Sequence, residues 1–276
     1  MIDPELEADT VRLRAVVRYD GTAFAGWQIQ PNGWTVQAAL EEALASIAQR
    51  PIRVHAAGRT DAGVHALAQV VHFDWPSDKP HERLALALSR MLAPSIRVSG
   101  LSAVAADFHA RFDATGKHYA YSLHLSPTPD PFTARYAWQV RAKLDMDHLS
   151  ALAQGVVGTH DFAGYQCVGT AIADTTRTIH SIAVAPGCVI GPSDAADHWT
   201  IHFRGNGFLY KMVRNLVGTL VDAARGKLPE SIIEERLISP GPYGGYTAPA
   251  HGLALVSVAY EGNLGAGAVD GPENPA

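Results

Sequence analysis

Residues 51–75 read PIRVHAAGRTDAGVHALAQVVHFDW: two apolar runs separated by a loop of small and charged residues. Their alternation and β-branched content predict strands at 51–56 and 65–75. The loop places Arg59 and Asp61 two residues apart among glycines and alanines. Because Asp and Gly are common in turns, the loop can be an ordinary solvated turn. It can also be the support of a catalytic carboxylate, since strands on both sides would hold Asp61 in place.

Strands and helices continue outward from this loop through the first half of the chain. Hydrophobic periodicity predicts a strand at 11–20, a helix at 36–49 that starts after the N-cap Thr35, a helix at 81–92 and a strand at 95–104. With the two strands beside the loop, the order is β-α-β-β-α-β, which is that of ferredoxin-like domains.

The second half repeats this order. The predicted elements are a strand at 117–125, a helix at 146–157 between Asp145 and Gly158, strands at 177–185 and 199–205, a helix at 207–225 that ends at Gly226, and a strand at 252–260. The recurrence indicates an internal duplication. We therefore expect an α+β fold in which two ferredoxin-like halves join into one mixed, mainly antiparallel sheet. Helices would cover the outer face, and a central active-site cleft would lie on the other face, where such folds often bind RNA.

Changes of composition divide the chain. We expect four segments: an acidic N-terminal tail at 1–10, an N-terminal half with the Asp61 loop at 11–112, a C-terminal half at 113–260, and a flexible Gly/Ala/Pro-rich tail at 261–276. Loops at 126–136 and 239–250 break the symmetry of the halves, and we expect them to carry specificity.

Length and composition indicate a globular enzyme-sized protein: the chain has 276 residues, of which 47% are hydrophobic and 18% charged. It has no apolar run long enough to span a membrane and no signal-peptide pattern at its N-terminus, so we expect a cytoplasmic protein. The net charge of −5 arises in the two tails. Between them basic residues slightly outnumber acidic ones, which permits RNA binding.

Neither the cysteines nor the histidines form a metal-binding motif. Cys167 and Cys188 lack a CxxC spacing, and we expect both to be reduced and structural. His198 and His202 lie at i and i+4, but in a predicted strand this spacing only places them on one face. No acid or cysteine completes a zinc set with this pair, so we expect no metal site.

Two further stretches carry charge in patterns that permit chemistry. In the helix at 207–225, five residues fall along one stripe at spacings of three and four: Lys211, Arg214, Gly218, Asp222 and Arg225. The stripe is either a solvated face or a surface kept bare for a close approach, because glycine in a helix interior costs roughly 1 kcal/mol. The stretch FHARFDATGKHYAYSL at 108–123 mixes aromatic and basic side chains, as do surfaces for unpaired nucleotides. The same pattern is also typical of an amphipathic strand with aromatic core residues.

The motifs together resemble one known family. YDGTAFAGWQIQ at 19–30, which alone indicates either a polar clamp or a packed turn, precedes AGRTDAGVHA at 57–66. Later come DFHARFDAT, HYAY, HDF, RTI, MVRNLVGTL and PAHGLALVSVAY. In this order, from about residue 12 to 260, the set is similar to the tRNA pseudouridine synthase A family, for which GRTDAGVHA is highly specific.

The resemblance implies an isomerase that converts uridine to pseudouridine at positions 38, 39 and 40 in the anticodon stem-loop of tRNA. It implies two similar halves with the active-site cleft at their junction. It also implies a homodimer in which each tRNA contacts both subunits, and no metal or organic cofactor.

Four residues match functional positions of that family. Asp61 matches the catalytic aspartate, and Arg59 matches the arginine that takes the place of the flipped-out base. Tyr119 matches the tyrosine that lies against the uracil, and Arg214 matches the basic partner of the aspartate. Asp61 would either attack C1′ of the ribose or remove the C2′ proton, and the sequence leaves both routes open.

Other basic positions bear on tRNA affinity. We expect Arg111 and Lys211 to contact tRNA. The chain departs from the family at Tyr210, where many members have a basic residue, and at Lys117 and His118, where a pair of arginines is common. These changes put phosphate contacts in doubt more than catalysis.

Two other functions fit parts of the pattern. A tRNA chaperone that remodels the anticodon arm would need binding but no chemistry, and the acidic tails weakly favour it. A nucleoside glycosidase would use the same aspartate but would have to admit water. The set Asp61, Tyr119 and Arg214 favours the isomerase over both.

Overall fold

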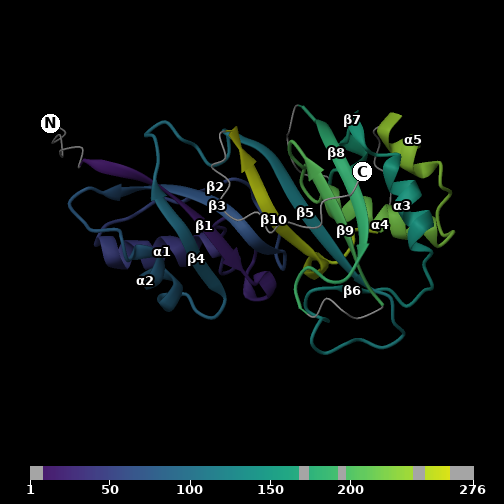
Figure 1. The fold of residues 1–276 in the computed structure, drawn as a ribbon, viewed down its shortest axis with the longest axis horizontal. Coiled ribbons are helices and arrows are strands. Elements are labelled where there is room, and N and C mark those ends of the chain that lie inside the picture. Colours follow the sequence, from purple (N-terminus) through teal and green to yellow (C-terminus); the bar gives the residue numbers. More distant parts are fainter. Residues whose placement is uncertain (1–8, 168–173, 192–196, 239–245, 262–276) are drawn as a thin grey trace. The chain divides into compact units, whose positions relative to one another are not determined.

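The computed structural model describes residues 9–167, 174–191, 197–238 and 246–261, and its helices and antiparallel strands confirm the α+β class (Figure 1). They form two compact units, residues 1–115 with 257–276, and residues 116–256. The domain bounds expected from the sequence stay predictions. Nearly all of both predicted tails, and much of the predicted specificity loop at 239–250, lie outside the described residues.

The first unit is an antiparallel sheet with two helices. Its strands are β4 (Ile96–Ala103), β1 (Thr10–Tyr19), β3 (His65–Pro76) and the short β2 (His55–Ala56), paired in that order. The helices α1 (Val36–Ala48) and α2 (Leu84–Met91) contact each other, and α2 packs on β4. Leu13, Ala15 and Val17 alternate along β1 and are fully buried. This strand order is that of a ferredoxin-like half.

One strand of this unit is shorter than predicted. The sequence predicts a strand at 51–56, but only His55–Ala56 pairs with β3. Two side chains of α1 take the backbone groups of Val54 instead: Glu41 Oε1 accepts from its N–H at 3.0 Å, and Gln37 Nε2 donates to its carbonyl at 3.0 Å. Because these bonds replace ladder bonds, the chain enters the sheet only at His55.

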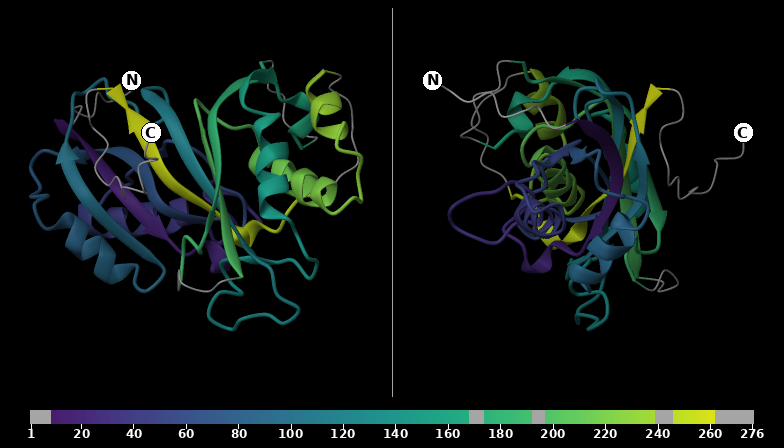
Figure 2. Two further views of the ribbon diagram at one scale, coloured as in Figure 1. Left: turned by 45° about the vertical axis from the view of Figure 1, so that its right-hand side comes forward. Right: turned by 90° about the vertical axis from the view of Figure 1, so that its left-hand side faces the viewer.

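The second unit has the same general build. Its antiparallel strands are β5 (Ala114–His124), β9 (His198–Gly205), β8 (Thr176–Pro186) and β7 (Gly158–Asp161), in that order, and β6 (Trp138–Gln139) pairs parallel to β5. The helices α3 (Met146–Gln154), α4 (Met212–Ala224) and α5 (Ile232–Ile238) lie together (Figure 2). The strand β10 (Leu253–Tyr260) has its first four residues in this unit and its last four in the first.

Two predicted helix boundaries in this unit are wrong, and three short elements were not predicted. The helix after the N-cap Asp145 ends at Gln154, and Gly158, at φ 120°, begins β7 instead of ending the helix. The helix predicted from 207 begins at Met212, because Lys211 has a left-handed backbone at φ 58° that a helix cannot continue through. The short elements β6, β7 and α5 are absent from the prediction, since so few residues show no clear periodicity.

In the described part of the chain, neither Cys167 nor Cys188 forms a disulfide bond. No helix in the described part of the chain combines the length and apolar character that spanning a bilayer requires.

Gly218 in α4 provides a test of packing. A Cβ atom there would lie 1.7 Å from the carbonyl oxygen of Tyr246, which is backbone and cannot rotate away. We expect Gly218→Ala to lower the free energy of unfolding by about 2–4 kcal/mol, because overpacking outweighs the gain in helix propensity. Urea denaturation measures this change. In the control Gly207→Ala, the nearest atom is Arg177 Cδ at 3.7 Å, an ordinary contact, so stability should change little. Equal stabilities of the two variants would contradict the argument.

Candidate active site

The Asp61 loop joins β2 to β3 in the first unit. Asp61 is half-buried and Arg59 is exposed. The carbonyl oxygen of Asp61 accepts from Val64 N at 3.1 Å, and Gly63 between them has φ 79°, which favours glycine. The loop around Asp61 is therefore a tight turn.

Hydrogen bonds from other elements hold the loop. The buried Tyr19 hydroxyl bonds to Thr60 Oγ1 at 2.8 Å, and Trp27 N donates to the Thr60 carbonyl at 3.0 Å. Gln69 Nε2 donates to the carbonyl of Gly58 at 2.8 Å. The residues that precede Asp61 in the loop are thus bonded to β1, to the segment after β1 and to β3, which fixes the backbone that leads to Asp61.

Two glycines let the segment 19–30 approach this loop. A Cβ atom at Gly21 would lie 2.0 Å from the carbonyl oxygen of Val64. One at Gly26, which has φ 98°, would lie 2.8 Å from the carbonyl oxygen of Thr60. Trp27 is 2% exposed. Of the two readings of YDGTAFAGWQIQ, the packed turn is therefore confirmed, and its role is to support the Asp61 loop. Sequence reasoning missed this contact, although the paired glycines beside a tryptophan were a signal for it.

Tyr119 and Tyr121 lie on β5 in the second unit and face different surroundings. Tyr119 is 8% exposed, and its ring meets that of Phe208 edge-on at 5.3 Å between centroids. Tyr121 is fully buried, and its hydroxyl donates to the carbonyl of Pro249 at 2.8 Å. Burial raises the pKa of Tyr121 well above its usual value. Tyr121 is therefore a structural residue, and of the pair only Tyr119 keeps a small exposed fraction.

Arg214 is fixed by a segment far along the chain. Its Nε donates to the carbonyl of Ala248 at 2.8 Å, and its own carbonyl accepts from Ala248 N at 3.1 Å. The same segment carries the Tyr246 carbonyl against Gly218. Because Gly218 has no side chain, the backbone at 246–248 can pack against α4 there. This backbone accepts the hydrogen bond from Arg214 Nε.

The rest of the predicted stripe on α4 has ordinary roles. Lys211 precedes the helix, and its ammonium lies 5.0 Å from the ring centre of Tyr210. Asp222 lies 3.9 Å from Arg225 and 3.8 Å from Lys227, in weak ion pairs. Only Arg214 and Gly218 depart from the pattern of a solvated helix face.

The stretch 108–123 divides between two environments. Arg111 and Phe112 are exposed, with the guanidinium 5.6 Å from the ring centre. His118 is 8% exposed, and its Nε2 lies 3.0 Å from His202 Nδ1. Burial, with Arg204 and His202 nearby, lowers the pKa of His118 to about 3. His118 is therefore neutral near pH 7, and unlike an arginine it carries no charge for a phosphate.

The described histidines contain one cluster with metal-ligating atoms. Ligand atoms of His124, Asp197 and His198 all lie within 4.8 Å of one another. The two rings are parallel, at 8° and 4.2 Å between centroids. An imidazole nitrogen binds a metal near the plane of its ring, and two stacked rings do not direct their lone pairs at one point. His124 Nε2 instead bonds to Asp197 at 3.0 Å, and His198 Nε2 bonds to Thr133 at 2.8 Å. The cluster is a hydrogen-bonded network.

The sequence-derived site residues fall in both units. Arg59, Asp61 and Arg111 belong to the first, and Tyr119, Lys211 and Arg214 belong to the second. Within the first unit, Arg59 and Asp61 share one loop; within the second, Arg214 is held by residues 246–248.

A double-mutant cycle tests the support of the Asp61 loop. We expect Tyr19→Phe to lower the free energy of unfolding by about 1–2 kcal/mol, because the buried Thr60 hydroxyl loses its partner. Thr60→Val should be less damaging in the Tyr19→Phe background than in the wild type, which gives a coupling energy in urea denaturation. Tyr210→Phe, at an exposed ring, is the control. Additive effects of the first two substitutions would show that the bond does not hold the loop.

Comparison with known proteins gives consistent matches. A family model described as tRNA pseudouridine synthase matches residues 15–113 and 152–261. A protein named tRNA pseudouridine synthase A from Solidesulfovibrio magneticus is 44% identical over 260 residues, which cover 90% of this chain and 91% of the relative. Proteins of the same name are 40% identical in Syntrophotalea carbinolica, covering 90% of this chain and 96% of the relative, and in an Exiguobacterium species, covering 91% and 98%.

Proposed function

Because this chain belongs to the tRNA pseudouridine synthase family, we propose that it modifies uridines 38, 39 and 40 of the anticodon stem-loop, with Asp61 as the catalytic carboxylate. The chain is an isomerase that converts uridine to pseudouridine in tRNA. The observation that supports Asp61 most directly is its place on a tight turn, directly after residues that are bonded to neighbouring elements, where the residue is only half-buried.

The reaction sets the demands on this carboxylate. The C1′–N1 bond must break, the uracil must turn, C5 must bond to C1′, and C5 must then lose its proton while N1 gains one. Asp61 either attacks C1′ as a nucleophile or removes the C2′ proton as a base. Both routes need the carboxylate within bonding distance of one ribose, and both fail if water captures the sugar. A fixed loop meets the first demand better than a mobile one.

The other site residues have proposed roles around the flipped nucleotide. Arg59 would occupy the space that the target base leaves, since its exposed guanidinium can stack on neighbouring bases. Tyr119 would lie against the uracil, and its ring is already held edge-on by Phe208. Arg214 would pair with Asp61, and the bond from its Nε to the carbonyl of Ala248 holds its side chain in place.

Contacts to the rest of the tRNA are part of the proposal. Arg111 and Lys211 would bind phosphates. Because His118 carries no positive charge, other basic side chains would bind the phosphates in its place. Flipping the uridine costs a few kcal/mol, which stacking on Tyr119 and insertion of Arg59 would offset. We also propose a homodimer, catalysis without a metal or organic cofactor, and a cytoplasmic location.

Substitution of the aspartate tests the assignment. We expect Asp61→Asn and Asp61→Ala to lower pseudouridine formation by roughly four orders of magnitude or more, because no other group replaces the carboxylate. Binding of tRNA should survive in a filter-binding assay. The readout is chemical mapping of pseudouridine in unmodified tRNA incubated with purified protein.

Asp78→Asn removes an exposed carboxylate of the same unit and should leave the rate unchanged. An Asp61 variant that still modified tRNA would overturn the catalytic assignment. A wild-type protein that bound tRNA but modified none of the three positions would favour the chaperone instead.

A further inference from the structure

Two arginines face each other directly across β1 and β4 in the first unit. The antiparallel register pairs Arg18 with Arg97, and both side chains are exposed. Residues directly opposite in a sheet project from the same face with their Cβ atoms roughly 5 Å apart. Like charges in this position destabilise the sheet. Arg18 and Arg97 therefore lower the stability of the sheet through their mutual repulsion.

Another arginine of the same strand shows the ordinary arrangement. Arg12 lies opposite Asp74 across β1 and β3, and its guanidinium bonds to both carboxylate oxygens at 2.8 and 3.0 Å. In the described part of the chain, no carboxylate forms an ion pair with Arg18 or Arg97. Arg18 Nε donates to the carbonyl of Leu67 at 3.3 Å, which holds its guanidinium over the sheet. The sheet thus keeps two cations together with no protein anion between them.

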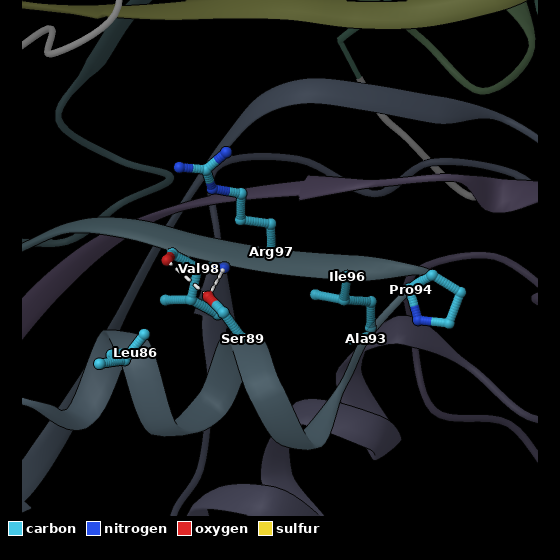
Figure 3. A pocket seen from close by; sticks show the side chains of 7 residues that line it. All are labelled: Leu86, Ser89, Ala93, Pro94, Ile96, Arg97 and Val98. Atoms are coloured by element: carbon cyan, nitrogen blue, oxygen red, sulfur yellow. Dashed lines mark hydrogen bonds between the residues drawn. The ribbon is translucent and has the colours of Figure 1, made fainter.

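The pair lies on the face of β4 that points away from α2. Ile96 and Val98 are 3% and 5% exposed on the α2 side, where Ser89 Oγ bonds to Val98. Arg97 extends from the opposite side of the strand (Figure 3). Ser99, two residues along β4, is exposed and follows the same alternation, so its hydroxyl adds a donor beside Arg97. Two guanidinium groups and a hydroxyl are the donors that a phosphate accepts from.

This surface is close to the Asp61 loop along the backbone. Arg18 precedes Tyr19, whose hydroxyl bonds to Thr60, the neighbour of Asp61. Because successive side chains of a strand point to opposite faces, an anion bound at Arg18 would lie on the other face of β1 from the Tyr19 side chain, in the same unit as the catalytic loop.

We propose that Arg18 and Arg97 together bind a backbone phosphate of the tRNA. The inference rests on the proposed function, because it takes RNA as the source of the anion. A phosphate placed between the guanidinium groups relieves their repulsion, and its release of counterions adds to affinity in a salt-dependent way. The site positions the RNA and takes no part in the chemistry.

The experiment compares Arg18→Gln/Arg97→Gln with the wild type in tRNA binding, pseudouridine formation and thermal unfolding. We expect the affinity for tRNA to fall roughly tenfold and the slope of log K against log salt to become shallower by about 2. In a phosphate-free buffer of low salt, Tm should rise by about 1–2 °C, because the like-charge pair is gone. Arg97→Glu should raise Tm and weaken tRNA binding as well, since it places an acid opposite Arg18.

The matched control is Arg83→Gln/Arg90→Gln, which removes the same charge from exposed residues at the two ends of α2, on the other side of β4. It should keep more of the affinity than the Arg18/Arg97 variant. Adding inorganic phosphate distinguishes the two sources of the anion: if it raises the Tm of the wild type as much as tRNA does, the site serves free phosphate and the RNA assignment is overturned.

Two further outcomes would overturn the proposal. One is binding and salt dependence equal to those of the control. The other is a joint loss of stability and affinity, which would show that the arginines hold the sheet together. Wild-type protein that forms no pseudouridine would instead defeat the proposed function, so the two failures are separable.

Discussion

The close approach of two backbones holds the candidate active site in position. Gly21 and Gly26 have no side chain where the carbonyl oxygens of Val64 and Thr60 lie, and the segment after β1 can therefore press against the Asp61 loop. The Tyr19 and Trp27 bonds to Thr60 form only at this distance. A Cβ atom at either position would push the loop away from its support. The position of Asp61 therefore depends on glycine at both positions.

The second unit uses the same device. Gly218 admits the backbone at 246–248, and that backbone binds both ends of the Arg214 residue, its carbonyl and its side chain. In each unit a glycine lets a distant segment approach and fix the chain around a charged residue, although Gly218 is costly by helix propensity. Placing the charged group is thus a tertiary property, and neither charged residue could be held by its own element alone.

This dependence explains how far the sequence could be read. Periodicity was sufficient for the long strands and helices, because burial on one face leaves a regular pattern, as in β1 and α1. It failed where distant groups decide the backbone: Glu41 and Gln37 take the bonds of Val54 and shorten β2. It failed again at Lys211, whose left-handed backbone delays α4. The motif GRTDAG identified Asp61 as a candidate, yet nothing local showed that residues 19–27 hold it, because that contact joins positions some 40 residues apart.

The location of the charged side chains is likewise more informative than the net charge. A net charge of −5 argues against an RNA partner only if charges are spread evenly, and they are not. His118, a base by composition, is buried and neutral, whereas Arg18 and Arg97 keep their charge at an exposed place where the sheet gains nothing from it. A protein that needed these arginines only for folding would separate them or place an acid between them, as it does for Arg12 and Asp74. Keeping them opposed is reasonable when the missing anion is supplied by the substrate, since binding energy then comes from relief of a repulsion already present in the free protein.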